Sequence, residues 1–184
     1  MYSFQLDKIP RNMLEKSKEI DYLNHTGVYF LFGTNENDED VVYIGQAGSR
    51  KNGKGILERL FEHRNDSNKD YFVETVIFTT QNNIFGSTEI IYLENRLCAI
   101  AKSSNRYIIK NEIEPTMGNV TEEKISELEE FIEYSKLVIG ALGYKILESI
   151  EINQVKKLEE EKIFYLNKNK IDAKGKITSG GFVY

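Results

Sequence analysis

The chain has 184 residues, of which 40% are hydrophobic and 29% charged, as is ordinary for one globular domain with a modest appendage. Its single cysteine, Cys98, excludes an intrachain disulfide and a metal site built from paired cysteines. The formal net charge of −5 argues on its face against a nucleic-acid partner, because phosphate binding relies on lysine and arginine.

Residues 1–24 are mixed in composition with weak helical character, and we expect them to form an N-terminal extension. They contain no long apolar run, so we expect no signal peptide. No other segment approaches the length of a membrane span. We therefore expect a cytoplasmic protein without a membrane partner.

Three strands are predicted in the next part of the chain. The run GVYFLFG begins at Gly27, and VVYIG begins at Val41 after the polar turn TNENDED, which indicates an antiparallel hairpin. A third strand, FVETVIFTT, is rich in β-branched and aromatic residues. Alternation in the first strand separates its side chains onto two faces, with Val28, Phe30 and Phe32 on one and Tyr29 and Leu31 on the other.

The loop after the second strand comes close to a phosphate-binding P-loop. It reads GSRKNGKG, with Gly55 where a P-loop needs the serine or threonine that holds magnesium. The strand before it is also expected to be a hairpin partner, whereas a P-loop belongs in a parallel sheet. Residues 50–64 contain five basic and two acidic residues, a net charge of +3. A solvated face and an anion-binding patch both remain open for them.

The predicted helix at 56–64 places Arg59 and His63 four residues apart, on one face beside its apolar arc. A lone histidine beside a core is usually structural. An arginine and a histidine together beside a basic glycine loop are more suggestive. Arginine can stabilise an oxyanion on phosphorus, and histidine can exchange a proton near neutral pH.

A second helix is predicted from an N-cap at Ser87 to about Ser103. Glu94 falls inside its apolar arc, where an unpartnered carboxylate costs several kcal/mol or shifts its pKa. We therefore expect Glu94 to have a partner, which could be a cation, a metal or a hydrogen-bonded network. A purely structural salt bridge with an arginine is an equally good interpretation.

The remainder divides into two expected segments after a boundary near Pro115 and Gly118. Residues 119–157 form an acidic helical extension, in which Thr121 caps a helix to about Leu142 and Gly143 ends it. Its apolar stripe is best explained as packing on the preceding core. Residues 158–184 form a partial β segment that ends in GGFVY, as if a strand began there with no partner after it. We expect the chain to stop inside a second small domain.

Six positions, taken in order, resemble the signature of the GIY-YIG nuclease family. GVY at 27–29 and YIG at 43–45 correspond to the two tripeptides that name the family, with valine in place of isoleucine in the first. The resemblance covers roughly residues 24–116, and residues 25–118 would form the nuclease domain. The other matching residues follow in the expected order, Arg59 and His63 on the first helix, Glu94 on the second helix and Asn111 after the short extended run RYIIKN.

The resemblance implies an α/β fold of the α+β type, a small, mostly antiparallel three-stranded sheet flanked by helices, followed here by the helical and β extension. It also implies metal-dependent hydrolysis of DNA phosphodiester bonds. Glu94 would hold one Mg²⁺ or Mn²⁺, and Arg59 would hold the scissile phosphate. Either Tyr43 or Tyr29 would orient or deprotonate the attacking water with help from the metal, Arg59 or His63, and Asn111 would support the site by hydrogen bonding.

The loop residues would lie beside the nucleic-acid backbone in this interpretation. Gly45 would let the chain turn tightly out of its strand. The proposed backbone contacts are Gly45, Arg50, Lys51, Lys54 and Arg64.

Three alternatives stay open. The chain could be a DNA- or RNA-binding module without catalysis, an interaction protein that uses its acidic helix, or, with less support, a P-loop nucleotide-binding protein. The tail KIDAKGKITSGGFVY resembles a small domain of unknown function appended to such nucleases. No zinc finger or helix-turn-helix is recognisable, so a protein or domain partner could supply specificity. The expected substrate is DNA, with RNA as the alternative.

Overall fold

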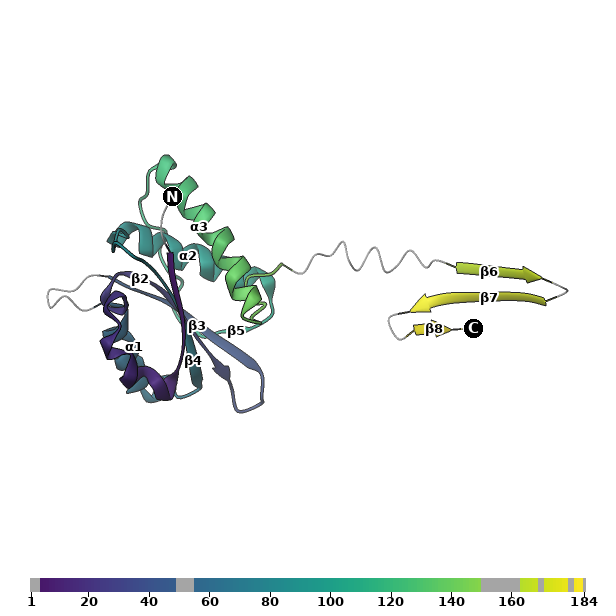
Figure 1. The fold of residues 1–184 in the computed structure, drawn as a ribbon, viewed down its shortest axis with the longest axis horizontal. Coiled ribbons are helices and arrows are strands. Elements are labelled where there is room, and N and C mark those ends of the chain that lie inside the picture. Colours follow the sequence, from purple (N-terminus) through teal and green to yellow (C-terminus); the bar gives the residue numbers. More distant parts are fainter. Residues whose placement is uncertain (1–3, 49–54, 150–162, 169–170, 179–180, 184) are drawn as a thin grey trace. The chain divides into compact units, whose positions relative to one another are not determined.

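The computed structural model describes residues 4–48, 55–149, 163–168, 171–178 and 181–183, in two compact units that span residues 1–149 and 150–184. The first unit has an α+β fold whose described strands form a five-stranded mixed sheet in the order β1-β4-β2-β3-β5 (Figure 1). The pairs β1–β4, β4–β2 and β2–β3 are antiparallel, and β3–β5 is parallel. The strands are β1 Phe4–Pro10, β2 Gly27–Thr34, β3 Asp40–Ala47, β4 Phe72–Thr80 and β5 Ile108–Ile109.

The sheet confirms the predicted hairpin and the third strand. The strands β2 and β3 pair antiparallel with Tyr29 opposite Gly45, and β4 pairs with the other edge of β2. The predicted alternation is also confirmed, because Val28 and Phe30 belong to the core on one face of the sheet and Tyr29 belongs to the core on the other. Since β2 is central, both of its faces are buried.

The expectation of a three-stranded sheet was wrong by two strands. One is β1, formed by residues that had been expected to be an extension, and its side chains are mostly half-buried with Ile9 alone buried. Such an edge strand carries little hydrophobic alternation for a sequence pattern to detect. The other is β5, which is two residues long and pairs with Val41 and Val42.

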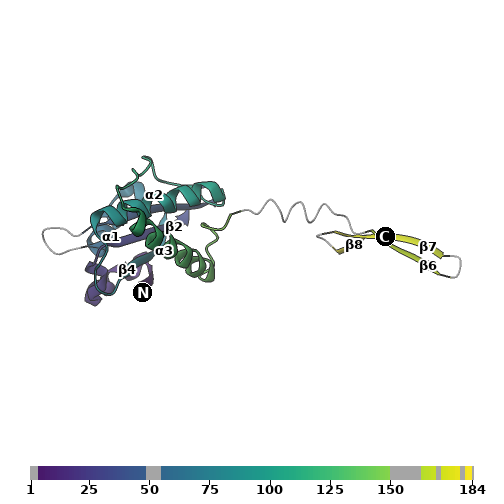
Figure 2. The same ribbon diagram turned by 90° about the horizontal axis from the view of Figure 1, so that it is seen from above.

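Helices cover both faces of the sheet (Figure 2). The helices α2 and α3 pack on the face that carries Phe30, while α1 and the 3-10 turns η1 and η2 pack on the face that carries Tyr29. None of the described helices combines the length and apolarity needed to cross a membrane. The helical segments are α1 Ile56–Arg64, α2 Ser87–Ser104, α3 Glu122–Ala141, η1 Arg11–Glu19, η2 Asp21–Asn24 and η3 Ser67–Lys69.

The helix ends agree with the sequence except at one cap. Gly86, not Ser87, is the N-cap of α2, and Ser87 is its first helical residue. Thr121 is the N-cap of α3, although its side chain makes no capping hydrogen bond. Gly143 follows α3 with φ of +94°, the left-handed conformation in which glycine ends helices without steric cost.

The helix α3 is part of the first unit's core. Phe131 on its inner face is 1% exposed, and its ring centroid lies 5.8 Å from that of Phe78 on β4 and 5.3 Å from that of Phe85. The contacts therefore group both residues 4–24 and α3 with the central sheet. The apolar stripe of the helix packs on this core, as the sequence indicated.

The second unit contains three described strands, β6 Ile163–Lys168, β7 Ile171–Thr178 and β8 Gly181–Val183, in an antiparallel sheet of order β6-β7-β8. The β segment that the sequence predicted from Ile163 is confirmed. The last strand, β8, pairs with β7, which precedes it in the chain. The charged run at 158–161 lies outside the described residues.

Replacing Phe131 by alanine is expected to lower the free energy of unfolding by about 3–5 kcal/mol, because it empties a buried aromatic site between α3 and the sheet. Leu137 lies on the same helix and is 74% exposed, so Leu137→Ala should change stability by no more than about 0.5 kcal/mol. Urea unfolding followed by circular dichroism measures both. Equal, small losses in the two variants would show that α3 is not part of the core.

Candidate active site

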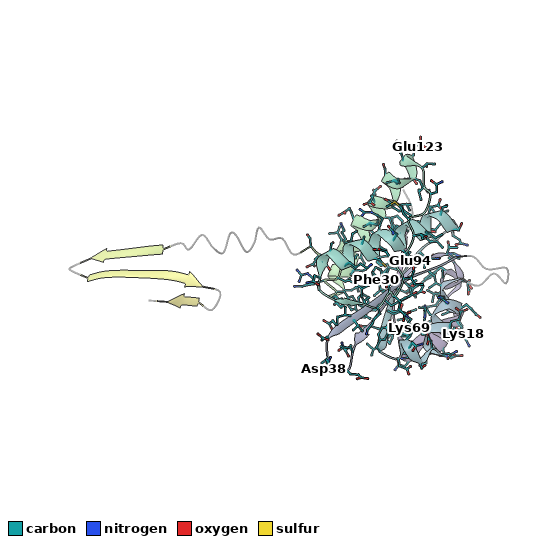
Figure 3. All side chains as sticks on the ribbon, turned by 180° about the vertical axis from the view of Figure 1, so that it is seen from behind. Lys18, Phe30, Asp38, Lys69, Glu94 and Glu123 are labelled. Atoms are coloured by element: carbon teal, nitrogen blue, oxygen red, sulfur yellow. The ribbon has the colours of Figure 1, made fainter. Side chains whose placement is uncertain are left out.

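A polar cleft of about 660 Å³ opens beside β3, between α1 and α2. The described strands pair with the outer edge of β3 only at Val41 and Val42, so the second half of β3 borders the cleft instead of another strand. The wall is completed by η3 and the segment 110–116. Figure 3 labels two of the lining residues, Glu94 from α2 and Lys69 from η3.

Five of the six predicted catalytic residues line this cleft, namely Tyr43, Arg59, His63, Glu94 and Asn111. The sixth, Tyr29, is fully buried behind it and is hydrogen-bonded to His63, with 2.8 Å between Oη and Nε2. The rings of Tyr43 and His63 meet edge to face with centroids 5.3 Å apart. The fold thus brings together side chains from β2, β3, α1, α2 and the segment after β5.

Gly45 is what allows Tyr29 to occupy its position. A Cβ atom at this position would lie 2.5 Å from Tyr29 Oη and 2.8 Å from a ring carbon of Tyr43. The prediction that Gly45 turns the chain out of its strand was wrong, because β3 continues to Ala47. The glycine is needed for the close approach of two tyrosine rings, not for a turn.

His63 is neutral at physiological pH. It is 4% exposed, and burial together with the charges of Arg59 and Lys69 lowers its pKa to about 4. The sequence had suggested a histidine that exchanges a proton near neutral pH, and the lowered pKa of His63 differs from that expectation. Burial and the proximity of Tyr43 also raise the pKa of Tyr29, so the bond between Tyr29 and His63 joins two uncharged groups.

Glu94 is a half-buried carboxylate that faces the cleft. Burial raises its pKa to about 7, although the positive charge of Arg59 opposes the shift. Among the described residues Glu94 makes no hydrogen bond and no salt bridge, so the structural ion pair with an arginine is not found there. Arg59 is instead paired with Glu62, with 2.6 Å between Nη1 and Oε2, and both side chains are about two-fifths exposed.

Asn111 braces the strand that carries Tyr43. Its Oδ1 accepts a hydrogen bond from the Ile44 N–H at 3.0 Å, and its Nδ2 donates to the Ile44 carbonyl at 2.7 Å. One side chain therefore replaces a strand partner on the open edge of β3. The role in a catalytic site that the resemblance implies for Asn111 stays a prediction.

Of the predicted backbone-contacting residues that the structure describes, neither Gly45 nor Arg64 is in the lining of this cleft. Arg64 lies on another hollow, where its Nη1 is 3.1 Å from Glu15 Oε2 and its guanidinium covers the Phe61 ring. Arg50, Lys51 and Lys54 lie outside the described residues.

Two lysines that the sequence had not singled out do line the cleft. Lys69 ends η3, and Lys110 follows β5. Neither sits in a periodic segment, so no sequence signal marked them. The described lining also carries five carboxylates and one further cation, the carboxylates being Glu62, Asp66, Glu94, Glu112 and Glu114 and the cation Arg59.

Comparison of the chain with family models, with curated proteins and with solved structures finds no match.

Gly45→Ala is expected to destabilise the protein by about 1–3 kcal/mol, because the added methyl group would overlap the Tyr29 hydroxyl. Gly48→Ala is the matched control, since the nearest atom to its added carbon would be Ile90 Cδ1 at 3.5 Å, an ordinary contact. Thermal and urea unfolding of the two variants should separate them. A Gly45 variant as stable as the Gly48 variant would contradict the packing described above.

Glu94→Gln is expected to stabilise the protein at pH 8 but not at pH 4. The carboxyl pKa is raised from 4.5 to about 7 on folding, so the folded state favours the protonated form. The stability that this provides is full below pH 4.5 and is lost as the pH rises to 7. Glutamine avoids the loss, and after allowance for solvent screening the gain at pH 8 should be about 1–2 kcal/mol.

Urea unfolding of wild type and Glu94→Gln in EDTA, at several pH values from 4 to 8, measures this difference. Other titrating groups are common to both proteins and cancel. A stability difference that does not change with pH would rule out Glu94 as a group with a raised pKa.

Proposed function

We propose that the chain is a divalent-metal-dependent endonuclease that hydrolyses DNA phosphodiester bonds, with a site of the kind found in the GIY-YIG nuclease family. The observation that carries the proposal is the convergence of six matched side chains that lie far apart in the sequence. Five line one cleft, and the sixth is hydrogen-bonded to one of those five. A coincidental match of short motifs would give no reason for these side chains to meet.

The sheet adds support for the family resemblance. The strands β4, β2 and β3 are neighbours and antiparallel, as expected for the family's three-stranded sheet, and β1 and β5 are added at its two edges. The helices α1 and α2 supply Arg59 and Glu94 in the expected order. The family assignment rests on these residues and on this arrangement of elements.

The residues present fit one divalent ion held by Glu94. Among the described residues no group of three or more His, Cys, Asp or Glu side chains could hold a metal, so the described residues would supply at most two such ligands, and Glu94 is a half-buried carboxylate that faces the cleft. Mg²⁺ is commonly held by one or two carboxylates, while water and substrate phosphate take the remaining positions. Mg²⁺ or Mn²⁺ bound there would neutralise charge that develops on the phosphate.

Arg59 is suited to hold the scissile phosphate. Its guanidinium also interacts with the hydroxyls of Tyr29 and Tyr43. Its exposed pair with Glu62 is worth no more than about 1 kcal/mol, so a phosphate in the cleft would compete readily with Glu62 for it. The guanidinium is permanently charged, and the negative charge of a phosphate in the cleft would be attracted to it without any change of protonation.

Tyr43 is the better of the two candidates for orienting the attacking water. It lines the cleft, whereas Tyr29 is fully buried and its hydroxyl is bonded to His63. Burial and the charge of Glu94 raise the pKa of Tyr43, so it holds its proton at neutral pH. As a neutral phenol it would orient water, and it would give up its own proton only if positive charge were added nearby.

Three further residues would then hold Tyr43 in position, namely Tyr29, His63 and Asn111. Tyr29 and His63 fill the space under its ring, and Asn111 fixes the backbone of the next residue. We assign these three residues positioning roles.

The charges of the cleft argue against a module that merely binds nucleic acid. Its described lining contains more carboxylates than cations, and such a balance repels a polyanion unless a metal ion is also present. A P-loop is also disfavoured, because the strand before residues 48–55 is the antiparallel partner of β2. The cytoplasmic location and a partner for specificity remain predictions.

A nicking assay on supercoiled plasmid with Mg²⁺ or Mn²⁺ tests the proposal. Wild type should cut, and Tyr43→Phe and Glu94→Gln should each lower the rate by about 100-fold or more, since they remove a water-orienting hydroxyl and the metal-holding carboxylate. Tyr134→Phe and Glu133→Gln, on the exposed side of α3, are matched controls and should cut like wild type.

Two results would contradict the proposal. Metal-dependent cutting that survives in Glu94→Gln and Tyr43→Phe would come from a contaminant or from another site. No cutting of DNA or RNA by wild type, with nucleic acid still retained in a gel shift, would favour the binding module.

A further inference from the structure

Lys69 and Lys110 form a pair of cations on one wall of the cleft. Lys69 Nζ lies 3.7 Å from the centroid of the Tyr43 ring, and Lys110 Nζ lies 5.8 Å from that of Tyr71. Both side chains are half-buried. The positive charge of Lys110 is among the influences that lower the pKa of Lys69, after burial as the largest, so the two ammonium groups interact.

Neither lysine has an ion-pair partner among the described residues. Arg59, by contrast, is paired with Glu62, and Lys102 is paired with Glu114 at 3.1 Å. Asp66 and Glu112 influence Lys69 through their charges but lie beyond salt-bridge distance of it. Two half-buried cations held on aromatic rings, neither of them in an ion pair with a described carboxylate, leave a place where an anion is favoured.

The cleft continues at this point into a second hollow of about 650 Å³. Lys110 and Asn68 line both spaces. The hollow adds hydrogen-bonding side chains, among them Asn35, Ser67 and Tyr71, and also two carboxylates, Glu36 and Asp70. Hydroxyl and amide groups of this kind commonly contact the phosphates and sugars of a nucleic-acid strand. The two spaces therefore share Lys110, the cleft adds the cations Arg59 and Lys69, and the two carboxylates belong to the lining of the hollow.

We propose that Lys69 and Lys110 form a second phosphate subsite, which holds a backbone phosphate next to the one that is cut and directs the strand into the hollow beyond. The subsite rests on the proposed use of the cleft for nucleic acid, and it assigns a role to two residues outside the six matched positions. It makes the lysines binding and positioning residues, with Arg59 on the scissile phosphate.

Salt dependence of binding tests the subsite. Fluorescence anisotropy would measure the Kd of the full chain for a fluorescein-labelled DNA duplex of about 20 base pairs, and for the RNA duplex of the same sequence, with Ca²⁺ in place of Mg²⁺ at about 50–250 mM KCl. Lys69→Gln and Lys110→Gln should each weaken binding about 5–10-fold and reduce the slope of log Kd against log salt by about 0.9. The double variant should reduce it by about twice as much.

Two further variants separate charge from folding. Lys69→Arg keeps the cation and should keep the wild-type slope. Lys136→Gln, which removes an ion-paired lysine on α3, should also leave the slope unchanged. Circular dichroism confirms that each variant is folded.

The possible outcomes distinguish this proposal from the nuclease assignment. Wild-type slopes in both single glutamine variants would overturn the subsite even if plasmid is cut. Reduced slopes with no cutting by wild type would uphold the subsite and overturn the nuclease. If wild type bound neither duplex, the subsite would be overturned. The nuclease assignment would then be decided by the plasmid assay alone.

Discussion

The contact between the ring of Tyr29 and the bare backbone of Gly45 is the constraint on which the site depends. Because these residues are direct partners across β2 and β3, a side chain at position 45 would displace the ring. The ring in turn presents its hydroxyl to His63 on α1, which ties the helix to the sheet. Arg59 lies one turn earlier on that helix, so the same contact fixes where its guanidinium enters the cleft.

The cleft concentrates ionisable groups whose surroundings disfavour their charge. Burial raises the pKa of Glu94 to about 7 and lowers that of Lys69, and neither finds an ion-pair partner in the described part of the chain. Such groups reduce the stability of the folded protein unless a ligand compensates them. The aromatic and aliphatic cores on the two faces of the sheet supply the stability that the site lacks.

Most of the regular structure could be predicted from the sequence, because the central strands and helices have strong periodic patterns. The helix at 56–64 and the hairpin around residues 35–39 appear where the alternation of side chains indicated them. The two added strands could not be predicted in the same way. β1 is a half-exposed edge without a clear alternation. β5 lies in the run RYIIKN, which the sequence indicated as extended, but its pairing with Val41 and Val42 leaves no local pattern.

The sequence by itself determined which residue types stand at the six matched positions and the order in which they follow one another. Tertiary structure alone decided that they meet, because their proximity depends on strand pairing and helix packing between distant segments. It also gave them different surroundings, since Tyr29 is buried behind Tyr43, burial keeps His63 neutral, and Asn111 is hydrogen-bonded to the Ile44 backbone. The burial of a side chain and its distance from other charged groups set its protonation state and its access to solvent. Neither quantity can be read from the sequence around that residue.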